Sequence, residues 1–166
     1  MKAVFLDRDG VINRERGEYT YLTQDFELIE GVVESIDKIK GYGYKVIVIT
    51  NQAGIAKGIY SVEQMKACHD KMQEACSHQI DAIYFAPLHP SVSESLARKP
   101  GSLMFERAIA KFAINVAQSW MAGDKMRDLI PAKALGISTI LVSEEGKEAD
   151  ADHQRKSLFH SLDLIR

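Results

Sequence analysis

Cysteine is scarce in this chain: only Cys68 and Cys76 occur among its 166 residues, too few for a disulfide scaffold. Long apolar runs are missing as well. The run at residues 46–49 is far below membrane-spanning length, and the first apolar stretch stops at Asp7, too early for a signal-peptide core. We therefore expect a soluble protein of the reducing cytoplasm, with no membrane partner.

An excess of either charge sign is absent too. Lys and Arg number 21 and Asp and Glu number 23, so the formal net charge is −2. A nucleic-acid partner is not expected, because such proteins carry a basic surplus on one face. No repeat, low-complexity run or linker divides the chain, and its length suits one hydrophobic core. We predict a single domain over residues 1–166, a monomer or a small homo-oligomer.

Short apolar strands alternate with helices along the chain. Apolar runs predict strands at residues 3–6, 44–49, 81–86, 118–122 and 138–142. Apolar positions at helical spacing predict helices at residues 32–41, 61–77, 102–112 and 129–135, with a further helical tail at 149–166. This order predicts an α/β fold, with a doubly wound, Rossmann-like, mostly parallel sheet and helices on both faces.

Two local features qualify this pattern. Ser61, followed three residues later by Gln64, predicts a capping box at the start of the second helix. Residues 8–28, called the flap segment below, are polar and aromatic without clear periodicity, and loops of that length tend to be functional.

Polar side chains follow the predicted strands, at the end of the sheet where such folds place their chemistry. Asp7 and Asp9 follow the first strand, Thr50 and Asn51 end the second, and Asp124 follows the fourth; Lys99 stands in an Arg-Lys-Pro sequence. These groups suit phosphoryl transfer. A carboxylate can attack phosphorus, a second can act as acid and base, and a hydroxyl and an ammonium can hold phosphoryl oxygens. A further carboxylate can complete a Mg²⁺ site.

The order Asp-x-Asp-Gly, Thr-Asn, Lys-Pro and Gly-Asp-x-x-x-Asp resembles the haloacid dehalogenase-like phosphohydrolases. All four motifs of that superfamily are matched, in order, over nearly the whole chain. Residues 5–13, 50–58 and 98–100 look like the subfamily of heptose-bisphosphate phosphatases and histidinol phosphatases. The chain is too short for a large cap domain, so a capless fold is expected, with the flap segment and loop 88–97 supplying specificity.

The resemblance implies a role for each matching residue. The catalytic residues would be Asp7 as nucleophile, Asp9 as general acid and base, and Thr50 and Lys99 as phosphate ligands. The Mg²⁺ ligands would be Asp7, the backbone carbonyl of Asp9, and Asp124. Asp128 is a further candidate, whose alternative role is that of a negative charge at a helix N-terminus. The substrate side would be lined by Asn51, Arg98 and Lys125.

One departure concerns zinc. The subfamily usually holds a structural zinc with a Cys-x-His loop followed by a Cys-x-Cys pair before Arg-Lys-Pro. Here the four matching positions are Ala86, Leu88, Ser95 and Ala97. The remaining His89 cannot supply the thiolate and imidazole ligands of a tetrahedral site. We expect no zinc, and the changed loop leaves the substrate open.

The expected function is that of a Mg²⁺-dependent phosphomonoesterase acting through an aspartyl-phosphate on a small phosphorylated metabolite. By resemblance, the leading substrate is D-glycero-D-manno-heptose 1,7-bisphosphate. Alternatives are a histidinol-phosphate phosphatase, another phosphatase of the subfamily, and a catalytically silent phosphate-binding protein. A phospho-accepting receiver domain is disfavoured, because the late Gly-Asp motif at Asp124 has no role in it.

The remaining cysteines and histidines suggest no site. Cys68 and Cys76 lie eight residues apart on one predicted helix, about 12 Å of rise, and cannot bond to each other. We interpret both as plain buried or half-buried thiols. His69, His78 and the histidines of the tail show no ligand spacing and are predicted to be surface residues.

Overall fold

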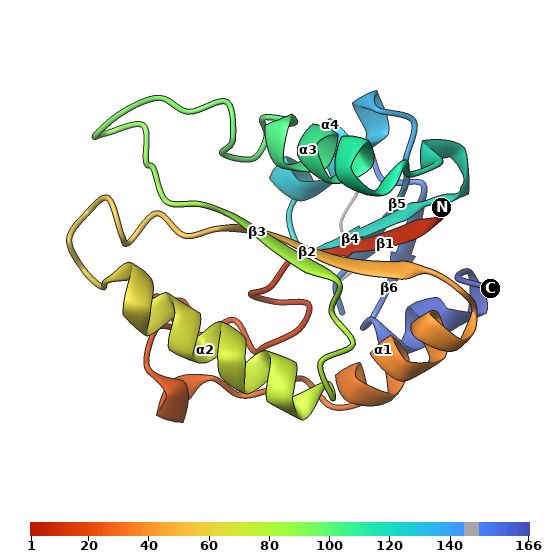
Figure 1. Ribbon diagram of the computed structural model, residues 1–166, viewed down its shortest axis with the longest axis horizontal. Coiled ribbons are helices and arrows are strands. Elements are labelled where there is room, and N and C mark those ends of the chain that lie inside the picture. Colours follow the sequence, from red (N-terminus) through yellow and green to blue (C-terminus); the bar gives the residue numbers. More distant parts are fainter. Residues whose placement is uncertain (145–149) are drawn as a thin grey trace.

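The computed structural model describes residues 1–144 and 150–166. Its centre is a six-stranded sheet in the order β3-β2-β1-β4-β5-β6, and every neighbouring pair is parallel (Figure 1). The strands are β1 (Ala3–Leu6), β2 (Lys45–Asn51), β3 (Ala82–Ala86), β4 (Trp120–Gly123), β5 (Ser138–Val142) and β6 (His153–Arg155). The predicted doubly wound α/β fold is confirmed.

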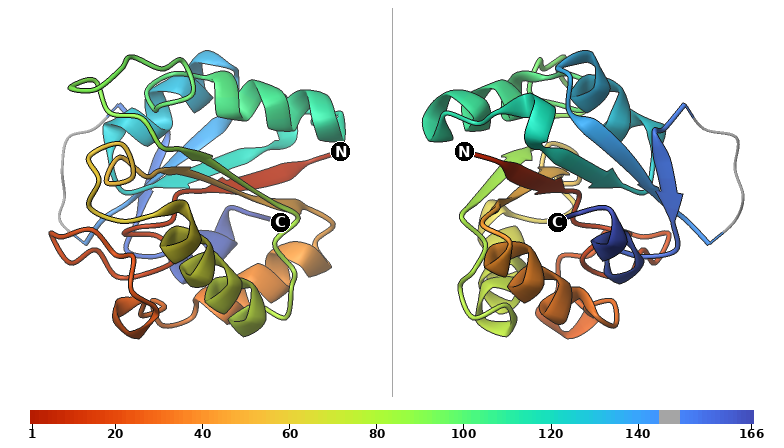
Figure 2. Two further views of the ribbon diagram at one scale, coloured as in Figure 1. Left: turned by 60° about the vertical axis from the view of Figure 1, so that its left-hand side comes forward. Right: turned by 90° about the vertical axis from the view of Figure 1, so that its right-hand side faces the viewer.

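Helices cover both faces of the sheet. In Figures 1 and 2, α1 (Val32–Gly41) and α2 (Val62–Ala75) lie on one face, and α3 (Leu103–Phe112) and α4 (Met126–Ala134) lie on the other. Short 3-10 helices are η1 (Thr23–Asp25), η2 (Val116–Gln118) and η3 (Phe159–Asp163). None of the helices in the described ranges is long and apolar enough to span a bilayer.

The four inner strands, β2, β1, β4 and β5, are buried on both faces, as continuous apolar runs predict, whereas the edge strands β3 and β6 are largely half-buried. In β1, Val4 and Leu6 belong to the core beneath α1 and α2, whereas Ala3 and Phe5 belong to the core beneath α3 and α4. All four side chains are fully buried. β1 is therefore packed between the two cores in the middle of the sheet, so the residues that follow it have a rigid support.

Local signals located most element boundaries. The capping box is present: Gln64 N donates to Ser61 Oγ at 3.2 Å, and Ser61 N donates to Gln64 Oε1 at 2.9 Å. The strands predicted at 3–6 and 138–142 match β1 and β5, and the helix predicted at 32–41 matches α1. The other strands and helices predicted before the tail differ from the observed ones by a few residues at their ends. Cys68 and Cys76 are buried free thiols, as interpreted.

The helical tail was a wrong prediction for the described part, residues 150–166. His153–Arg155 instead form β6, which pairs with the edge of β5, and a 3-10 helix follows. Asp152 fixes this arrangement, since its Oδ2 accepts from both the amide and the hydroxyl of Thr139 at 2.8 Å. The periodic Leu158 and Ile165 do reach the core. The open hydrogen-bonding edge of β5 outweighed local helical periodicity.

The strand order reverses between β1 and β4. Connections from β1 run to one side of the sheet and connections from β4 to the other, which opens a crevice at their carboxyl ends. Asp7 N donates to Ala122 O at 3.0 Å and so extends the pairing of β1 with β4 to this point. The flap segment begins here. Near its two ends, Arg14 N donates to Glu27 O at 2.9 Å, which ties the start of the segment to its end.

Candidate active site

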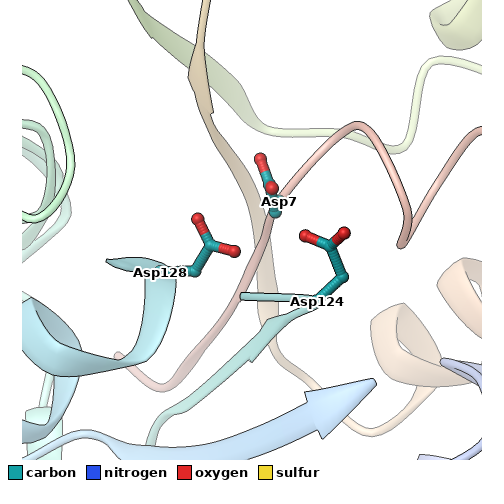
Figure 3. A group of neighbouring side chains, drawn as sticks. All are labelled: Asp7, Asp124 and Asp128. Atoms are coloured by element: carbon teal, nitrogen blue, oxygen red, sulfur yellow. The ribbon is translucent and has the colours of Figure 1, made fainter. Parts of the chain in front are cut away.

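Three carboxylates meet at this crevice. Asp7 follows β1, Asp124 follows β4, and Asp128 lies in the first turn of α4; Figure 3 shows their side chains pointing toward one another. One oxygen from each lies within 4.8 Å of the others. Asp128 Oδ2 also accepts from Lys125 N at 3.1 Å, so it caps α4 and joins the cluster at once. Both roles considered for Asp128 from the sequence thus fit its position.

Glycines make this close approach sterically feasible. Gly10 has φ +87°, and a Cβ there would lie 2.5 Å from Asp124 Oδ2. A Cβ at Gly123 would lie 2.5 Å from Asp128 Cβ. Both distances are far inside van der Waals contact, and the positive φ is one that only glycine adopts without strain. The Asp-Gly and Gly-Asp pairs of the sequence are therefore requirements of carboxylate packing.

Lys99 supplies the buried counter-charge. Its Nζ lies 2.8 Å from Asp7 Oδ1 and 2.7 Å from Asp128 Oδ1, and it donates to Ile49 O at 2.7 Å. Its side chain is 1% exposed. Burial alone would lower the pKa of Lys99, but the carboxylates of Asp7 and Asp128 outweigh it and raise that pKa. The ammonium therefore stays charged.

The carboxylates themselves are crowded. Burial, and next the charge of Asp128, raise the pKa of Asp7 to about 7, although Lys99 acts in the opposite direction. Burial and the charge of Asp7 likewise raise the pKa of Asp124. The site is thus short of positive charge when all three carboxylates are ionised.

A divalent cation would supply the positive charge that this site lacks. Asp7, Asp124 and Asp128 bring three negative charges against the single buried ammonium of Lys99. Asp124 Oδ1 is buried and receives no hydrogen bond from the part of the chain that the structure describes. Clustered carboxylate oxygens are the ligands that Mg²⁺ prefers. The residues present therefore fit the predicted magnesium site.

Asp9 lies beside this cluster with its side chain 26% exposed. Its Oδ1 accepts from Arg8 NH2 at 2.9 Å and from Asn13 Nδ2 at 3.0 Å. Its Oδ2 has a weaker contact, 3.5 Å from Gln52 Nε2. One carboxylate oxygen is thus anchored, whereas the other is lightly held, as an oxygen that takes and releases a proton requires.

Arg8 joins Asp9 to the flap segment and to α2. It is almost fully buried, donates to Thr20 O at 2.8 Å, and lies 3.5 Å from His69 Nε2. The prediction that His69 is a surface residue was wrong. His69 stands at helical spacing from the buried Met65, Cys68 and Met72, so it belongs to the inner stripe of α2. Burial, and then the charge of Arg8, lower the pKa of His69 to about 4.

The end of β2 contributes Thr50 and Asn51. Asn51 pins Lys99 in place, since its Nδ2 donates to Lys99 O at 3.1 Å and its Oδ1 accepts from Lys99 N at 3.0 Å. Thr50 is fully buried, and its Oγ1 accepts from Gln52 Nε2 at 2.9 Å. Asn51 lines the cavity over the carboxylates, whereas Thr50, which is fully buried beside it, is not among the lining residues.

A cavity of about 500 Å³ opens over Asp7. Lys99 and Lys125 line it, and Lys125 Nζ contacts Glu15 Oε2 at 3.1 Å and Asp124 Oδ2 at 3.5 Å. Arg98 instead lines a neighbouring hollow with Glu94 and Leu96, not the cavity over Asp7. Most of the predicted site residues therefore gather at the carboxylate cluster and its cavity. Thr50 lies next to the cavity without lining it, and Arg98 lines the neighbouring hollow.

Several cavity residues were missed from the sequence: Arg8, Glu15, Gln52, Tyr60 and Arg127. The position of Arg8 between two candidate aspartates was a signal for it. The run Thr50-Asn51-Gln52 was a signal for Gln52. Glu15, Tyr60 and Arg127 carried no local signal, because they reach the cavity only through the folding of separate segments.

The loop in which zinc would be expected is held together by hydrogen bonds among its own residues. His89 Nδ1 lies 2.7 Å from Ser91 Oγ, and Ser95 Oγ accepts from Ala97 N at 3.2 Å. Arg98 NH1 donates to Leu88 O at 3.3 Å and so ties the two arms of the loop together. The absence of zinc remains a prediction.

Comparison with known proteins agrees with this site. A family model described as HAD-hydrolase-like matches residues 96–163. The D-glycero-beta-D-manno-heptose-1,7-bisphosphate 7-phosphatase of Haemophilus ducreyi is 36% identical over 176 residues, covering 99% of this chain and 96% of the relative. The protein of the same name from Escherichia coli K12 is 36% identical over 154 residues, covering 87% and 80%.

Solved structures show the same fold. A D,D-heptose 1,7-bisphosphate phosphatase from B. bronchiseptica, complexed with magnesium and phosphate, matches with a TM-score of 0.89 at 25% identity, over 99% of this chain and 98% of that one. The enzyme from Burkholderia thailandensis matches with a TM-score of 0.70 at 28% identity, over 99% of both. By identity, coverage and fold, this chain is a phosphatase that belongs to the haloacid dehalogenase-like hydrolases, in the family of the heptose-1,7-bisphosphate 7-phosphatases.

Proposed function

We propose that this protein is a Mg²⁺-dependent phosphomonoesterase that works through an aspartyl-phosphate at Asp7. The observation that carries the proposal is the cluster of Asp7, Asp124 and Asp128 around the buried ammonium of Lys99, beneath an open cavity. Such a cluster suits a dianionic phosphate ester only when a cation completes it. Mg²⁺ held by Asp7, the carbonyl of Asp9 and Asp124, with Asp128 as a further candidate, would neutralise the charge that the phosphoryl group brings.

The two oxygens of Asp7 have different tasks in this proposal. Oδ1 accepts from Arg8 N and from Lys99 Nζ, each at 2.8 Å. No hydrogen bond to Oδ2 is found within residues 1–144 and 150–166. Oδ2 is therefore the oxygen that attacks phosphorus. Lys99 keeps the carboxylate oriented and offsets its charge as the phosphoryl group approaches.

Asp9 handles the protons. Protonated at its lightly held Oδ2, it gives that proton to the leaving alkoxide as the bond from phosphorus to the ester oxygen breaks. The resulting carboxylate then takes a proton from water, which attacks the aspartyl-phosphate and returns the carboxylate of Asp7 with inorganic phosphate. The anchored Oδ1, bonded to Arg8 and Asn13, keeps Asp9 in reach for both steps.

For the substrate, we propose a small phosphorylated sugar, with D-glycero-D-manno-heptose 1,7-bisphosphate as the lead. The support is the names of the relatives, which match over nearly the whole chain. Histidinol phosphate is the alternative. Asn51 and Lys125 would contact the sugar from the cavity wall, and Lys99 would contact the phosphate. Thr50, whose Oγ1 accepts from Gln52 Nε2 at 2.9 Å, is the further proposed phosphate ligand. Arg98 would serve only a substrate that extends into the neighbouring hollow.

We also propose that residues 1–166 act as one domain, which the single continuous sheet supports. Between the described strands the structure has only α1 to α4 and the short 3-10 helices η1 and η2. A cytoplasmic location, the absence of nucleic-acid and membrane partners, and a monomer or small homo-oligomer remain predictions.

A substrate screen tests the proposal. Phosphate release from a panel of sugar phosphates, sugar bisphosphates, histidinol phosphate and nucleotides is measured with Mg²⁺ and with a chelator, and kcat/KM ranks them. We expect turnover only with the metal and the highest kcat/KM for the heptose bisphosphate. A higher kcat/KM for histidinol phosphate would make that compound the proposed substrate instead. No turnover of any ester would refute the enzymatic proposal.

The covalent step needs its own measurement. Replacing Asp9→Asn should slow hydrolysis of the intermediate, so that substrate labelled in its phosphate leaves label on the protein. An acyl phosphate releases that label in hydroxylamine. Label that resists hydroxylamine, or that persists in Asp7→Asn, would rule out an aspartyl-phosphate at Asp7.

A further inference from the structure

One buried glutamine connects two proposed catalytic side chains. Gln52 is 1% exposed at the end of β2. Its Nε2 lies 2.9 Å from Thr50 Oγ1 and 3.5 Å from Asp9 Oδ2. Its Oε1 accepts from the hydroxyl of Tyr60 at 2.7 Å. Every polar atom of this amide therefore faces a partner.

In the stage of the proposed cycle in which Asp9 is ionised, the chemistry of these partners allows one arrangement. The carboxylate of Asp9 can then only accept hydrogen bonds, so the NH₂ end of Gln52 faces it. An NH₂ group can only donate, so Thr50 Oγ1 must accept from it. Within the described residues Thr50 Oγ1 donates to nothing, so its hydroxyl hydrogen has no acceptor among them. The orientation of Gln52, which is held between Asp9 and Tyr60, thereby sets the direction of the Thr50 hydroxyl.

Tyr60 holds the other end of the amide. Its hydroxyl must donate, because Gln52 Oε1 can only accept. Burial raises the pKa of Tyr60 to about 12, so the hydroxyl keeps its proton. The ring is stacked on Tyr21 at 5.1 Å and 7°, and Tyr19 packs against it at 5.8 Å. The flap segment thus clamps the ring that orients Gln52.

We propose that Gln52 is a positioning residue, oriented by Tyr60, that turns the Thr50 hydroxyl hydrogen toward the phosphoryl group and steadies Asp9 Oδ2. Its effect on turnover rests on the proposed function, whereas its effect on phosphate binding rests only on the proposed contact of Thr50 with the phosphate. The 3.5 Å contact to Asp9 is long enough to release the oxygen during proton transfer. The 2.9 Å contact to Thr50 is a full hydrogen bond.

A double-mutant cycle tests the link to Thr50. The dissociation constant of inorganic phosphate with Mg²⁺ is measured by calorimetry for wild type, Gln52→Leu, Thr50→Val and the double variant. We expect Gln52→Leu to weaken phosphate binding about 10-fold, a size typical of partners that orient site groups. The double variant should bind within about twofold of Thr50→Val alone, because the glutamine acts through the hydroxyl.

Turnover gives the second readout. Gln52→Leu should lower kcat on the order of 10- to 100-fold, through Asp9 as well as Thr50. Gln118→Leu is the matched control, because Gln118 is exposed in η2, at the opposite end of β4 from Asp124; it should keep the wild-type kcat. Tyr60→Phe removes one hydroxyl and keeps the stacked ring, so it repeats both tests in the same direction if Gln52→Leu does not fold.

The outcomes separate the two proposals. The positioning role would be overturned if the double variant weakened phosphate binding by the product of the two single losses, or if Gln52→Leu left phosphate binding unchanged. Either result would count even if wild type is an active phosphatase. Coupled effects on phosphate binding without turnover of any ester would keep the positioning role of Gln52 toward Thr50 and refute the proposed activity. A wild type that binds no phosphate would overturn both.

Discussion

The ammonium of Lys99 lies 2.8 Å from the carboxylate of Asp7, although 92 residues separate them in the chain. Both side chains are buried, and Asn51 fixes the backbone of Lys99 from β2. The loop after β3 therefore has to close onto the sheet before the candidate nucleophile gains its counter-charge. Stability and catalysis should both depend on this pair.

Replacing Lys99→Met should destabilise the fold and abolish activity. The change leaves Asp7 and Asp128 buried without their ammonium, and removing one partner of a buried ion pair costs about 3–5 kcal/mol. Urea unfolding measures the loss. Lys66→Met, at an exposed position of α2, is the control and should change the free energy of unfolding little. Equal stability of the two variants would contradict the buried pairing.

Replacing Asp7→Asn should separate function from stability. Phosphatase activity should vanish, because the amide is no nucleophile. The pKa of Asp7 is raised to about 7 from 3.8, so ionising it opposes folding as pH rises from about 4 to 7, and the full cost is present at pH 8. The metal-free variant should therefore be more stable than metal-free wild type at pH 8.

The control for this variant is Asp70→Asn, which removes the same charge at an exposed position of α2. It should leave both activity and stability at pH 8 near the wild-type values. Substantial turnover by Asp7→Asn would contradict the assignment of Asp7 as the nucleophile. A metal-free Asp7→Asn protein less stable than wild type at pH 8 would contradict the crowding of carboxylates.

His69 should make the fold sensitive to acid. Its pKa is lowered to about 4 from 6.5, so between these values the unfolded chain binds a proton that the folded chain does not. Its contribution to stability is full above pH 6.5 and declines as pH falls toward 4. The variant His69→Asn should lose less stability than wild type between pH 7 and pH 4.5, as measured by urea unfolding at each pH.

His78→Asn is the matched control, because His78 is exposed just after α2 and its φ of +55° is one that asparagine tolerates. Its pH dependence should parallel that of wild type. If His69→Asn also paralleled wild type, the buried neutral imidazole beside Arg8 would not be the source of the acid sensitivity.

Purified protein should contain no stoichiometric zinc. The four positions expected to hold the metal carry Ala86, Leu88, Ser95 and Ala97, none of which offers a thiolate or an imidazole. Elemental analysis after dialysis, with magnesium measured in the same sample, checks this. Zinc at one equivalent that survives dialysis against a chelator would contradict the prediction.

Much of the fold was accessible from the sequence because its signals are local. Apolar runs of strand length, the Ser61–Gln64 capping box and polar residues at strand ends each act within a few residues. The tail shows the limit of local signals. Its helical periodicity is real, yet β5 offered an open edge, and pairing with it took His153–Arg155 into the sheet.

The sequence by itself determined the order of elements, the family resemblance and the carboxylates that follow β1 and β4, because chain order and strand ends are properties of neighbouring residues. Only the tertiary structure decided that Asp128 shares Lys99 with Asp7, that His69 is buried, and that Gln52 joins Thr50 to Asp9. These relationships depend on how separate segments pack against one another. The scarcity of cysteine excluded a disulfide scaffold, and packing around a parallel sheet supplied the rigidity instead.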